Sequence, residues 1–138
     1  MIKKTYIKYK EIINYLIFGI LTTIISLITY YTLILTILNP NNPIELQIAN
    51  IISWIFSVTF AYITNKKYVF NSHEKNVKKE ILKFYSSRIS TLFIDIILMF
   101  IFVSILKLND KIIKIFVQII VIISNYILSK LIVFKKSL

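Results

Sequence analysis

The residues of this chain best suited to chemistry are charged and polar side chains set within long apolar runs. Arg88, Thr91 and Asp95 recur at positions i, i+3 and i+7, so at 100° per residue they share one helix face. A carboxylate at the centre of a membrane span costs about 2.5–3.5 kcal/mol on insertion scales. We therefore expect Asp95 to face other helices, with Arg88, Lys130 or the amide of Asn125 as its partner. A structural buried pair and a substrate or proton site would both produce this pattern.

A second polar face is expected on the last apolar run of the chain. Gln118, Asn125 and Ser129 share one side of a helix, with Lys114 close to it. Lys114 lies near one end of the run and Lys130 near the other, so both ammonium groups can snorkel toward a membrane surface. Asn125 lies near the middle, where an unpaired amide is costly. We therefore expect Asn125 to have a partner inside the protein.

Small and polar residues also line one face of each of the first two apolar runs. Small side chains let helices approach closely, and hydroxyls and amides can bond across the contact. The pattern suits plain helix packing or a polar seam for a headgroup, and we expect the stripe of the second run to face another helix. That stripe comprises Asn50, Ser53, Ser57, Ala61 and Thr64, and the face of the first run comprises Gly19, Thr22 and Ser26.

The sequence contains no recognisable catalytic machinery. Cysteine is absent, His73 stands alone in a polar stretch, and there is no nucleotide-binding loop, metal-ligand cluster or nucleophile constellation. We therefore expect a protein that is not an enzyme and that holds no metal or cofactor. The net charge of +11 would suit nucleic acid or anionic lipid, but its distribution favours lipid and membrane topology, so no nucleic-acid partner is expected.

These side chains belong to a chain whose composition requires a membrane. Of its 138 residues, 57% are hydrophobic, which is more apolar surface than one soluble domain of this size can bury. Four apolar segments, 12–37, 46–65, 84–106 and 112–134, match the roughly 20 residues that a helix needs to cross the hydrocarbon core. The first segment is too long for a signal peptide and lacks a small-residue cleavage site, so we interpret it as a retained helix. The prediction is an all-α integral membrane protein with a single transmembrane domain, 1–138.

Basic residues predict which side of the membrane each connection faces. Four lysines precede the first helix and six lie in the polar stretch 66–83, whereas the turn 39–45 has none and the turn 107–111 has two. Lys135 and Lys136 follow the last helix. Because positive charge accumulates in cytoplasmic loops, both termini and the 66–83 stretch are predicted to be cytoplasmic. The protein is thus expected in the cell membrane as a multi-pass protein.

The two halves of the chain resemble each other. Each half would form one helical hairpin, and an even number of crossings gives both halves the same orientation, which makes the repeat parallel. Chance similarity between isoleucine-rich helices is the alternative, but a shared Lys-x-x-Val-Phe ending favours duplication. The aligned pairs are Glu11 with Glu80, Tyr15 with Phe84, Thr22 with Thr91, Ser26 with Asp95, and the segment 62–70 with 126–134.

Four motifs, in order, resemble the GtrA-like family of small four-helix membrane proteins over nearly the whole chain. The opening of the first helix, the ends of the second and fourth helices and the pattern of the third all have counterparts in that family. The third-helix pattern has the form associated with Gram-positive-type members. The motifs are Tyr15-x-x-Phe18-Gly19, Phe60-Ala61-Tyr62-x-x-Asn65-Lys66-Lys67-x-Val69-Phe70, Arg88-x-x-Thr91-x-x-x-Asp95-x-x-x-Met99 and Asn125-Tyr126-x-x-Ser129-Lys130-x-x-Val133-Phe134.

The resemblance implies a role in the glycosylation of cell-surface polysaccharide or teichoic acid. Family members are usually described as translocating undecaprenyl-phosphate-linked sugars beside a membrane glycosyltransferase. On this hypothesis the phosphate would be received near the cytoplasmic boundary and the sugar hydroxyls deeper in the membrane. The substrate-binding set is then Arg88 and Lys130 for the phosphate, Asp95 and Asn125 for the sugar, and Asn65 and Lys66 in the equivalent motif of the first half.

Two other functions remain open at the level of sequence. A similar domain is fused to some polyprenyl-phosphate glycosyltransferases, so the chain could assemble or anchor such an enzyme without transporting anything. A small proton-coupled exporter is the weaker alternative, because four helices with one buried acid would also suit it. Four helices make a thin wall for a sugar path, which favours a homodimer or a complex with the glycosyltransferase, surrounded by membrane lipids.

Overall fold

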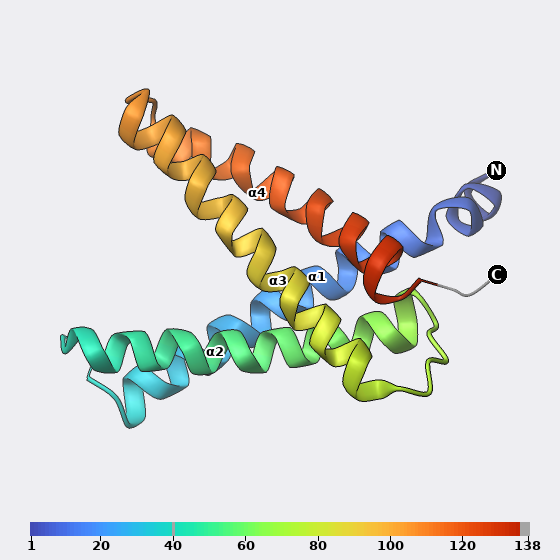
Figure 1. The fold of residues 1–138 in the computed structure, drawn as a ribbon, viewed down its shortest axis with the longest axis horizontal. Coiled ribbons are helices and arrows are strands. Elements are labelled where there is room, and N and C mark those ends of the chain that lie inside the picture. The colour runs from blue at the N-terminus through green and yellow to red at the C-terminus, as the bar shows by residue number, and fades with distance from the viewer. Residues whose placement is uncertain (40, 136–138) are drawn as a thin grey trace. The chain divides into compact units, whose positions relative to one another are not determined.

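The computed structural model describes residues 1–39 and 41–135, and within them it contains helices and turns but no strand. The long helices are α1 (Ile2–Thr36), α2 (Pro43–Thr64), α3 (Val77–Met99) and α4 (Asp110–Leu128) (Figure 1). A π-helical segment continues each of the last three: η1 (Asn65–Val69), η2 (Phe100–Ile105) and η3 (Ser129–Val133). Four of the described helices are long and apolar enough to cross a membrane. The predicted all-α, four-helix architecture is confirmed.

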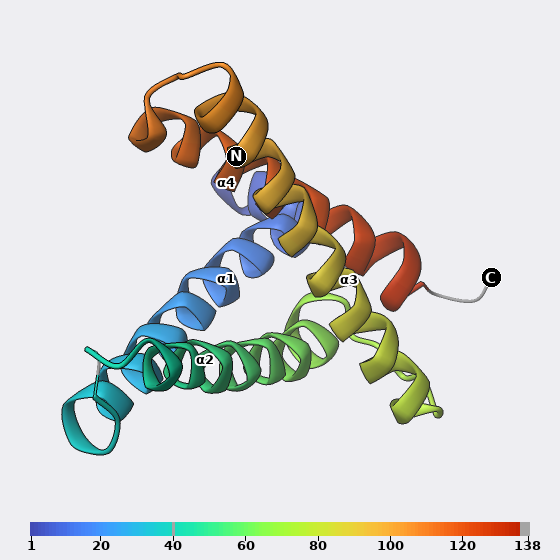
Figure 2. The same cartoon turned by 60° about the vertical axis from the view of Figure 1, so that its left-hand side comes forward.

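The chain folds into two compact units, Met1–Ser72 and His73–Leu138. In the first unit α1 packs along α2, and in the second α3 packs along α4 (Figure 2). The start of each unit's first helix meets the end of its second, so both units are antiparallel hairpins. We call Met1–Ser72 the first hairpin and His73–Leu138 the second hairpin.

The helices extend beyond the apolar segments at their lysine-rich ends. The first helix begins at Ile2 rather than near residue 12, the second continues through η1 to Val69, and the third begins at Val77 rather than near residue 84. Lysine and glutamate are good helix formers, so the helices do not end where the apolar run ends. The polar stretch 66–83 is therefore mostly helical, and a short link at 70–76 joins the two hairpins.

Asparagine side chains mark the beginnings of α2 and α3. Asn42 Oδ1 accepts a hydrogen bond of 3.0 Å from the backbone N–H of Ile44, and Pro43 occupies the first turn of the helix. Asn76 Oδ1 accepts one of 3.2 Å from the backbone N–H of Lys79. Such a cap satisfies a backbone donor that helix geometry leaves unpaired, and it typically contributes about 1 kcal/mol.

Two residues other than glycine adopt the left-handed conformation where a helix ends. Asn71 has φ 46° after η1, and Lys107 has φ 56° after η2. The next N–H groups, those of Ser72 and Leu108, donate back to carbonyl oxygens six residues earlier at 2.8 and 3.0 Å. Glycine is the usual residue at such a stop because it has no Cβ. This chain has a single glycine elsewhere, so asparagine and lysine take these positions.

Each hairpin closes with a pair of aromatic rings at equivalent positions. Tyr15 meets Phe70 with ring centroids 6.5 Å apart and ring planes tilted by 56°, and Phe84 meets Phe134 at 5.9 Å and 53°. All four rings are buried. Because Tyr15 aligns with Phe84 and Phe70 with Phe134, the two halves share this local geometry, as the predicted repeat requires. We call each ring pair an aromatic clasp.

A π-helical turn leads into each clasp. The N–H of Phe70 donates to the carbonyl of Asn65 at 2.9 Å, and the N–H of Phe134 donates to the carbonyl of Ser129 at 2.8 Å. Backbone hydrogen bonds between residues five apart, which define the π-helix, are rare and are frequently found at functional sites. Asn65 and Ser129 are both buried, and a lysine follows each of them.

The small-residue stripe of α2 is shielded, as predicted, except at one end. Ser53, Ser57, Ala61 and Thr64 are buried, whereas Asn50 is exposed. The hydroxyl groups of Ser53 and Ser57 donate to carbonyl oxygens of their own helix at 2.9 Å. With its hydrogen bonds satisfied locally, the stripe supports close packing of α2.

Candidate polar site in the second hairpin

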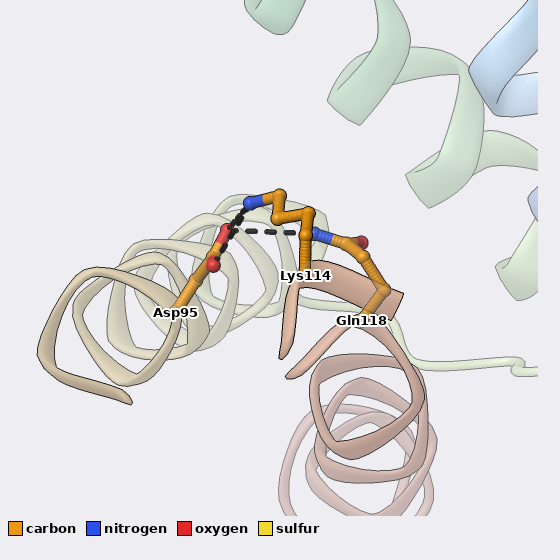
Figure 3. A network of polar contacts seen from close by, with 3 residues as sticks. All are labelled: Asp95, Lys114 and Gln118. Atoms are coloured by element: carbon orange, nitrogen blue, oxygen red, sulfur yellow. Dashed lines mark hydrogen bonds and ion pairs between the residues drawn. The ribbon is translucent and has the colours of Figure 1, made fainter. Parts of the chain in front are cut away.

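The carboxylate of Asp95 is the centre of a polar contact between α3 and α4 (Figure 3). Lys114 Nζ lies 3.0 Å from Oδ1 and 2.9 Å from Oδ2 of Asp95. The side-chain amide of Gln118 adds a longer contact, with Nε2 at 3.5 Å from Oδ2. Lys114 and Gln118 are one turn apart on α4, so both reach the same carboxylate on α3.

This ion pair is only partly enclosed by the protein. The side chain of Asp95 is 18% exposed and that of Lys114 is 47% exposed. The ammonium group neutralises an acid that would otherwise be expensive in an apolar helix. Because the Lys114 side chain is nearly half exposed, the pair is not sealed inside the hairpin.

A neutral contact lies on the same face of α3, one turn toward the clasp. The hydroxyl of Thr91 is 2.7 Å from Asn125 Oδ1 on α4 and 3.0 Å from the carbonyl oxygen of Arg88, so it has two acceptors within reach. Thr91 is buried and Asn125 is partly buried. The predicted internal partner of Asn125 is therefore the hydroxyl of Thr91.

Cationic side chains lie nearer the clasp. The guanidinium carbon of Arg88 sits 4.7 Å from the centroid of the Phe84 ring, in cation–π contact. Lys130 Nζ donates to the hydroxyl of Tyr126 at 3.3 Å. Next to Lys130, the hydroxyl of Ser129 is fully buried and has no hydrogen-bond partner among the residues that the structure describes.

We call the residues that line α3 and α4 in this way the polar column. It runs from the clasp toward the turn between the two helices, with cationic groups near the clasp, a neutral pair in the middle and an ion pair beyond it. Its members are Arg88, Thr91 and Asp95 on α3, and Lys114, Gln118, Asn125 and Lys130 on α4 and η3.

The predicted partner of Asp95 was wrong. We expected Arg88, Lys130 or Asn125, but Asp95 is held by Lys114 and Gln118. Arg88 lies seven residues before Asp95, about 10 Å along the helix, and its side chain lies over Phe84 instead. Lys114 also turns inward to Asp95, whereas its place near the helix end suggested that it would snorkel outward. The signal for Lys114 was its place beside the face of Gln118 and Asn125.

The substrate-binding set predicted from the sequence is divided between the hairpins. Arg88, Asp95, Asn125 and Lys130 belong to the polar column. Asn65 and Lys66 belong to η1 of the first hairpin, where Asn65 is 3% exposed and Lys66 is partly buried. In the repeat they are the counterparts of Ser129 and Lys130, so they mark an equivalent position rather than the same contact.

The first hairpin lacks a comparable column. Extending the repeat alignment along each helix places Ser26 opposite Asp95 and uncharged residues at the other column positions, except that Lys66 is the counterpart of Lys130. The hydroxyl of Thr22, the counterpart of Thr91, donates to the carbonyl of Phe18 in its own helix at 2.7 Å. A Cβ at Gly19, the counterpart of Arg88, would meet no atom within 4 Å. The counterparts on α2 of Lys114, Gln118 and Asn125 are Asn50, Trp54 and Ala61.

The fold and the column define a class: a helical, multi-pass membrane protein made of two similar hairpins, of which the second holds an ion pair between its membrane-spanning helices. The chain belongs to the family of the GtrA/DPMS transmembrane domain, whose family model matches residues 14–134. The resemblance inferred from the motifs is thereby confirmed, as is the location in the cell membrane. No solved structure matches the chain significantly.

Relatives with this domain occur in several bacteria. The chain is 39% identical to the "Cell wall teichoic acid glycosylation protein GtcA" of Listeria monocytogenes serovar 1/2a, over 91% of this chain and 85% of the relative. It is 40% identical, with the same coverage, to the protein of that name in Listeria innocua. It is 38% identical to the "Uncharacterized membrane protein YwcD" of Bacillus subtilis, over 89% of this chain and 95% of the relative.

Proposed function

We propose that this chain takes part in the glycosylation of cell-surface polysaccharide, as the names of its Listeria relatives state for those proteins. Its specific role would be that of a flippase, translocating an undecaprenyl-phosphate-linked sugar across the cytoplasmic membrane. The similarity covers most of this chain and most of each relative, which supports a shared role for the whole protein.

The observation that carries the transport proposal is the polar column. Polar groups inside a membrane helix are expensive and are retained where they serve a pathway or a site. Apart from Lys66, the counterpart of Lys130, the equivalent positions of the first hairpin are uncharged, so hairpin packing alone does not account for the column. A lipid-linked sugar presents an anionic phosphate and several hydroxyls, which a column of cationic and hydrogen-bonding groups suits.

The column residues take different parts in this proposal. Arg88 and Lys130, near the clasp, bind the phosphate, because guanidinium and ammonium groups form charge-assisted hydrogen bonds with it. Asn125 and Asp95 bond to the sugar hydroxyls. Asn65 and Lys66 are the corresponding contacts in η1 of the first hairpin. A membrane glycosyltransferase would supply or use the lipid-linked sugar, and a second copy of the chain would thicken the wall of the path.

A test in cells compares matched positions of the two hairpins. We expect Thr91→Val and Asn125→Leu to lower the sugar content of the cell-wall polymer about fivefold or more, the effect of losing one hydrogen bond worth about 1 kcal/mol. Thr22→Val, the counterpart of Thr91→Val, should leave it unchanged. Membrane levels of each variant are measured in parallel. Equal sugar content in all three variants, at equal protein levels, would remove the column from the function.

A second test separates transport from assembly of a partner enzyme. The purified chain is reconstituted in vesicles with a fluorescent polyprenyl-phosphate sugar on both leaflets, and the fraction bleached by an impermeant reductant is followed. Transport raises the bleached fraction above one half, and Asn125→Leu abolishes the rise. If the parent chain gives no rise but co-purifies with a glycosyltransferase, it is an assembly subunit. A rise that requires a proton gradient and occurs with unrelated small molecules would indicate an exporter.

A further inference from the structure

The ion pair between Lys114 and Asp95 is the part of the column that the proposed function leaves unexplained. Lys114 Nζ contacts both carboxylate oxygens at 2.9 and 3.0 Å, and Gln118 Nε2 approaches one of them at 3.5 Å. Figure 3 shows the lysine and glutamine of α4 directed at the same carboxylate of α3. These N–H groups form a donor set around an anion, and a phosphate oxygen would satisfy the same donors.

The pair is not needed to build a hairpin of this kind. Ser26, Asn50 and Trp54 occupy the three equivalent positions of the first hairpin, which carries no charge there. That hairpin nevertheless closes with an equivalent aromatic clasp and an equivalent π-helical turn.

The position of Lys114 gives the column a cation on each side of its neutral middle. Arg88 lies about 10 Å from Asp95 along α3, toward the clasp, and the contact between Thr91 and Asn125 lies between them. Lys114 reaches Asp95 from the side of the interhelical turn. An anionic headgroup that leaves Arg88 would therefore meet Lys114 next.

We propose that Lys114 is a second phosphate-binding residue of the column, and that Asp95 serves as an internal anion which occupies Lys114 until the phosphate displaces it. This proposal rests on the proposed function and deepens it by adding a second phosphate position. Displacement also frees the Asp95 carboxylate to accept hydrogen bonds from the sugar hydroxyls. No bond is made or broken in this exchange; one anion replaces another on the same ammonium group.

The test uses the purified full-length chain in detergent and radiolabelled polyprenyl monophosphate, which carries no sugar. Asp95→Asn removes the anion that competes for the Lys114 ammonium group, so it should strengthen binding by about two- to fivefold. Lys114→Gln should weaken it about tenfold or more, the loss expected for one charged hydrogen bond. Lys114→Arg should bind within a few-fold of the parent chain, and Ser26→Ala is the matched control in the first hairpin.

Asp95→Asn is expected to strengthen lipid binding and Lys114→Gln to weaken it, whereas a purely structural role of the pair would change binding in the same direction for both. If the pair only supports folding, Asp95→Asn and Lys114→Gln will weaken binding together, and that result overturns the proposal. Gel-filtration profiles identify any variant that misfolds, and Lys114→Arg then supplies the lysine-side comparison. Asp95→Asn with Lys114→Gln should bind as weakly as Lys114→Gln alone; recovery to the parent affinity would also overturn it.

Competition experiments show whether the bound anion is a lipid phosphate or free phosphate. A separate measurement in cells distinguishes failure of this proposal from failure of the proposed transport function. Unlabelled polyprenyl monophosphate should displace the probe, whereas polyprenol and millimolar inorganic phosphate should not; displacement by inorganic phosphate alone would show a free-anion site instead. Cell-wall sugar content is measured separately. If Lys114→Gln loses lipid binding but keeps full glycosylation, the proposed function fails while the phosphate site stands.

Discussion

The two hairpins are alike at their ends and different in their middles. At the clasp end each has a π-helical turn, a buried small polar residue followed by a lysine, and a buried aromatic pair. In the middle, the second hairpin holds Asp95 against Lys114 and Thr91 against Asn125, whereas the first holds a serine, a threonine and a small-residue stripe. The clasp end packs the two helices of each hairpin together, whereas the residues in the middle of the hairpin can differ without changing that packing.

The same comparison distinguishes polar residues that serve packing from those that we propose to bind a ligand. Ser53 and Ser57 are buried and satisfied within their own helix, so they permit close packing without offering a free group. Asp95 and Lys114 are satisfied across helices and remain partly exposed. The difference is whether the side chain bonds within its own helix or to the neighbouring helix.

The first prediction concerns orientation and should give an all-or-none result. If the hairpins are parallel repeats, their turns face one side of the membrane and the link between them faces the other. The chain contains no cysteine, so Asn42→Cys, Asn109→Cys and Ser72→Cys each introduce a single thiol. An impermeant thiol reagent applied to intact cells should label the first two, and Ser72→Cys only after lysis. Labelling of Ser72→Cys alone would reverse the orientation.

The second prediction tests whether the two clasps contribute equally to the stability of their hairpins. Phe84→Ala removes a ring that is 0% exposed, and we expect a loss of about 3–5 kcal/mol, as for other phenylalanine truncations in packed interiors. Tyr15→Ala, its counterpart at 7% exposed, should cost a similar amount or slightly less. Unfolding in mixed micelles with increasing denaturing detergent measures both. A loss below about 1 kcal/mol for Phe84→Ala would show that the clasp does not hold the second hairpin.

The third prediction concerns the small-residue stripe of the first hairpin. Ser57 is 6% exposed, so Ser57→Phe forces a large ring into a closed contact and should cost about 1–3 kcal/mol. Its repeat counterpart Val121 is only partly buried, and Val121→Phe should cost less. The same micelle assay applies. If Ser57→Phe is as stable as the parent chain, the stripe borders a roomy space rather than a close contact.

Much of this fold follows from the sequence because membrane-spanning helices can be recognised by the length of their apolar runs. Runs of about 20 apolar residues fix the number of helices. The repeat aligned Tyr15 with Phe84 and Phe70 with Phe134, but the contact between the rings of each hairpin was not predicted. The ends of the helices were less accurate. Lysine-rich turns continue as helix until Asn76 or a left-handed residue intervenes, and hydropathy does not detect those signals.

The polar site was predictable by residue type but not by pairing. Helical periodicity placed Asp95 and Asn125 on inward faces, and the structure gives both a partner on the other helix. Which residues meet depends on the axial register of α3 against α4, which no local pattern encodes. The direction taken by Lys114 depends on that register as well, because its long chain can reach either the membrane surface or Asp95.

The last prediction has the smallest effect and concerns the turns opposite the clasps. Lys107 ends η2 with φ 56°, a conformation that costs a residue with a Cβ roughly 1–2 kcal/mol. Lys107→Gly relieves that strain but adds freedom to the unfolded chain, so we expect a net gain of about 0.5–1 kcal/mol. Leu38 is the counterpart of Lys107 in the first hairpin and does not have a positive φ. Leu38→Gly therefore has no strain to relieve and should leave stability unchanged or lower it. Thermal unfolding in detergent should raise the Tm of Lys107→Gly by about 2–4 °C. An equal rise for Leu38→Gly would show that general loosening of the turns, rather than the left-handed geometry at Lys107, explains the gain.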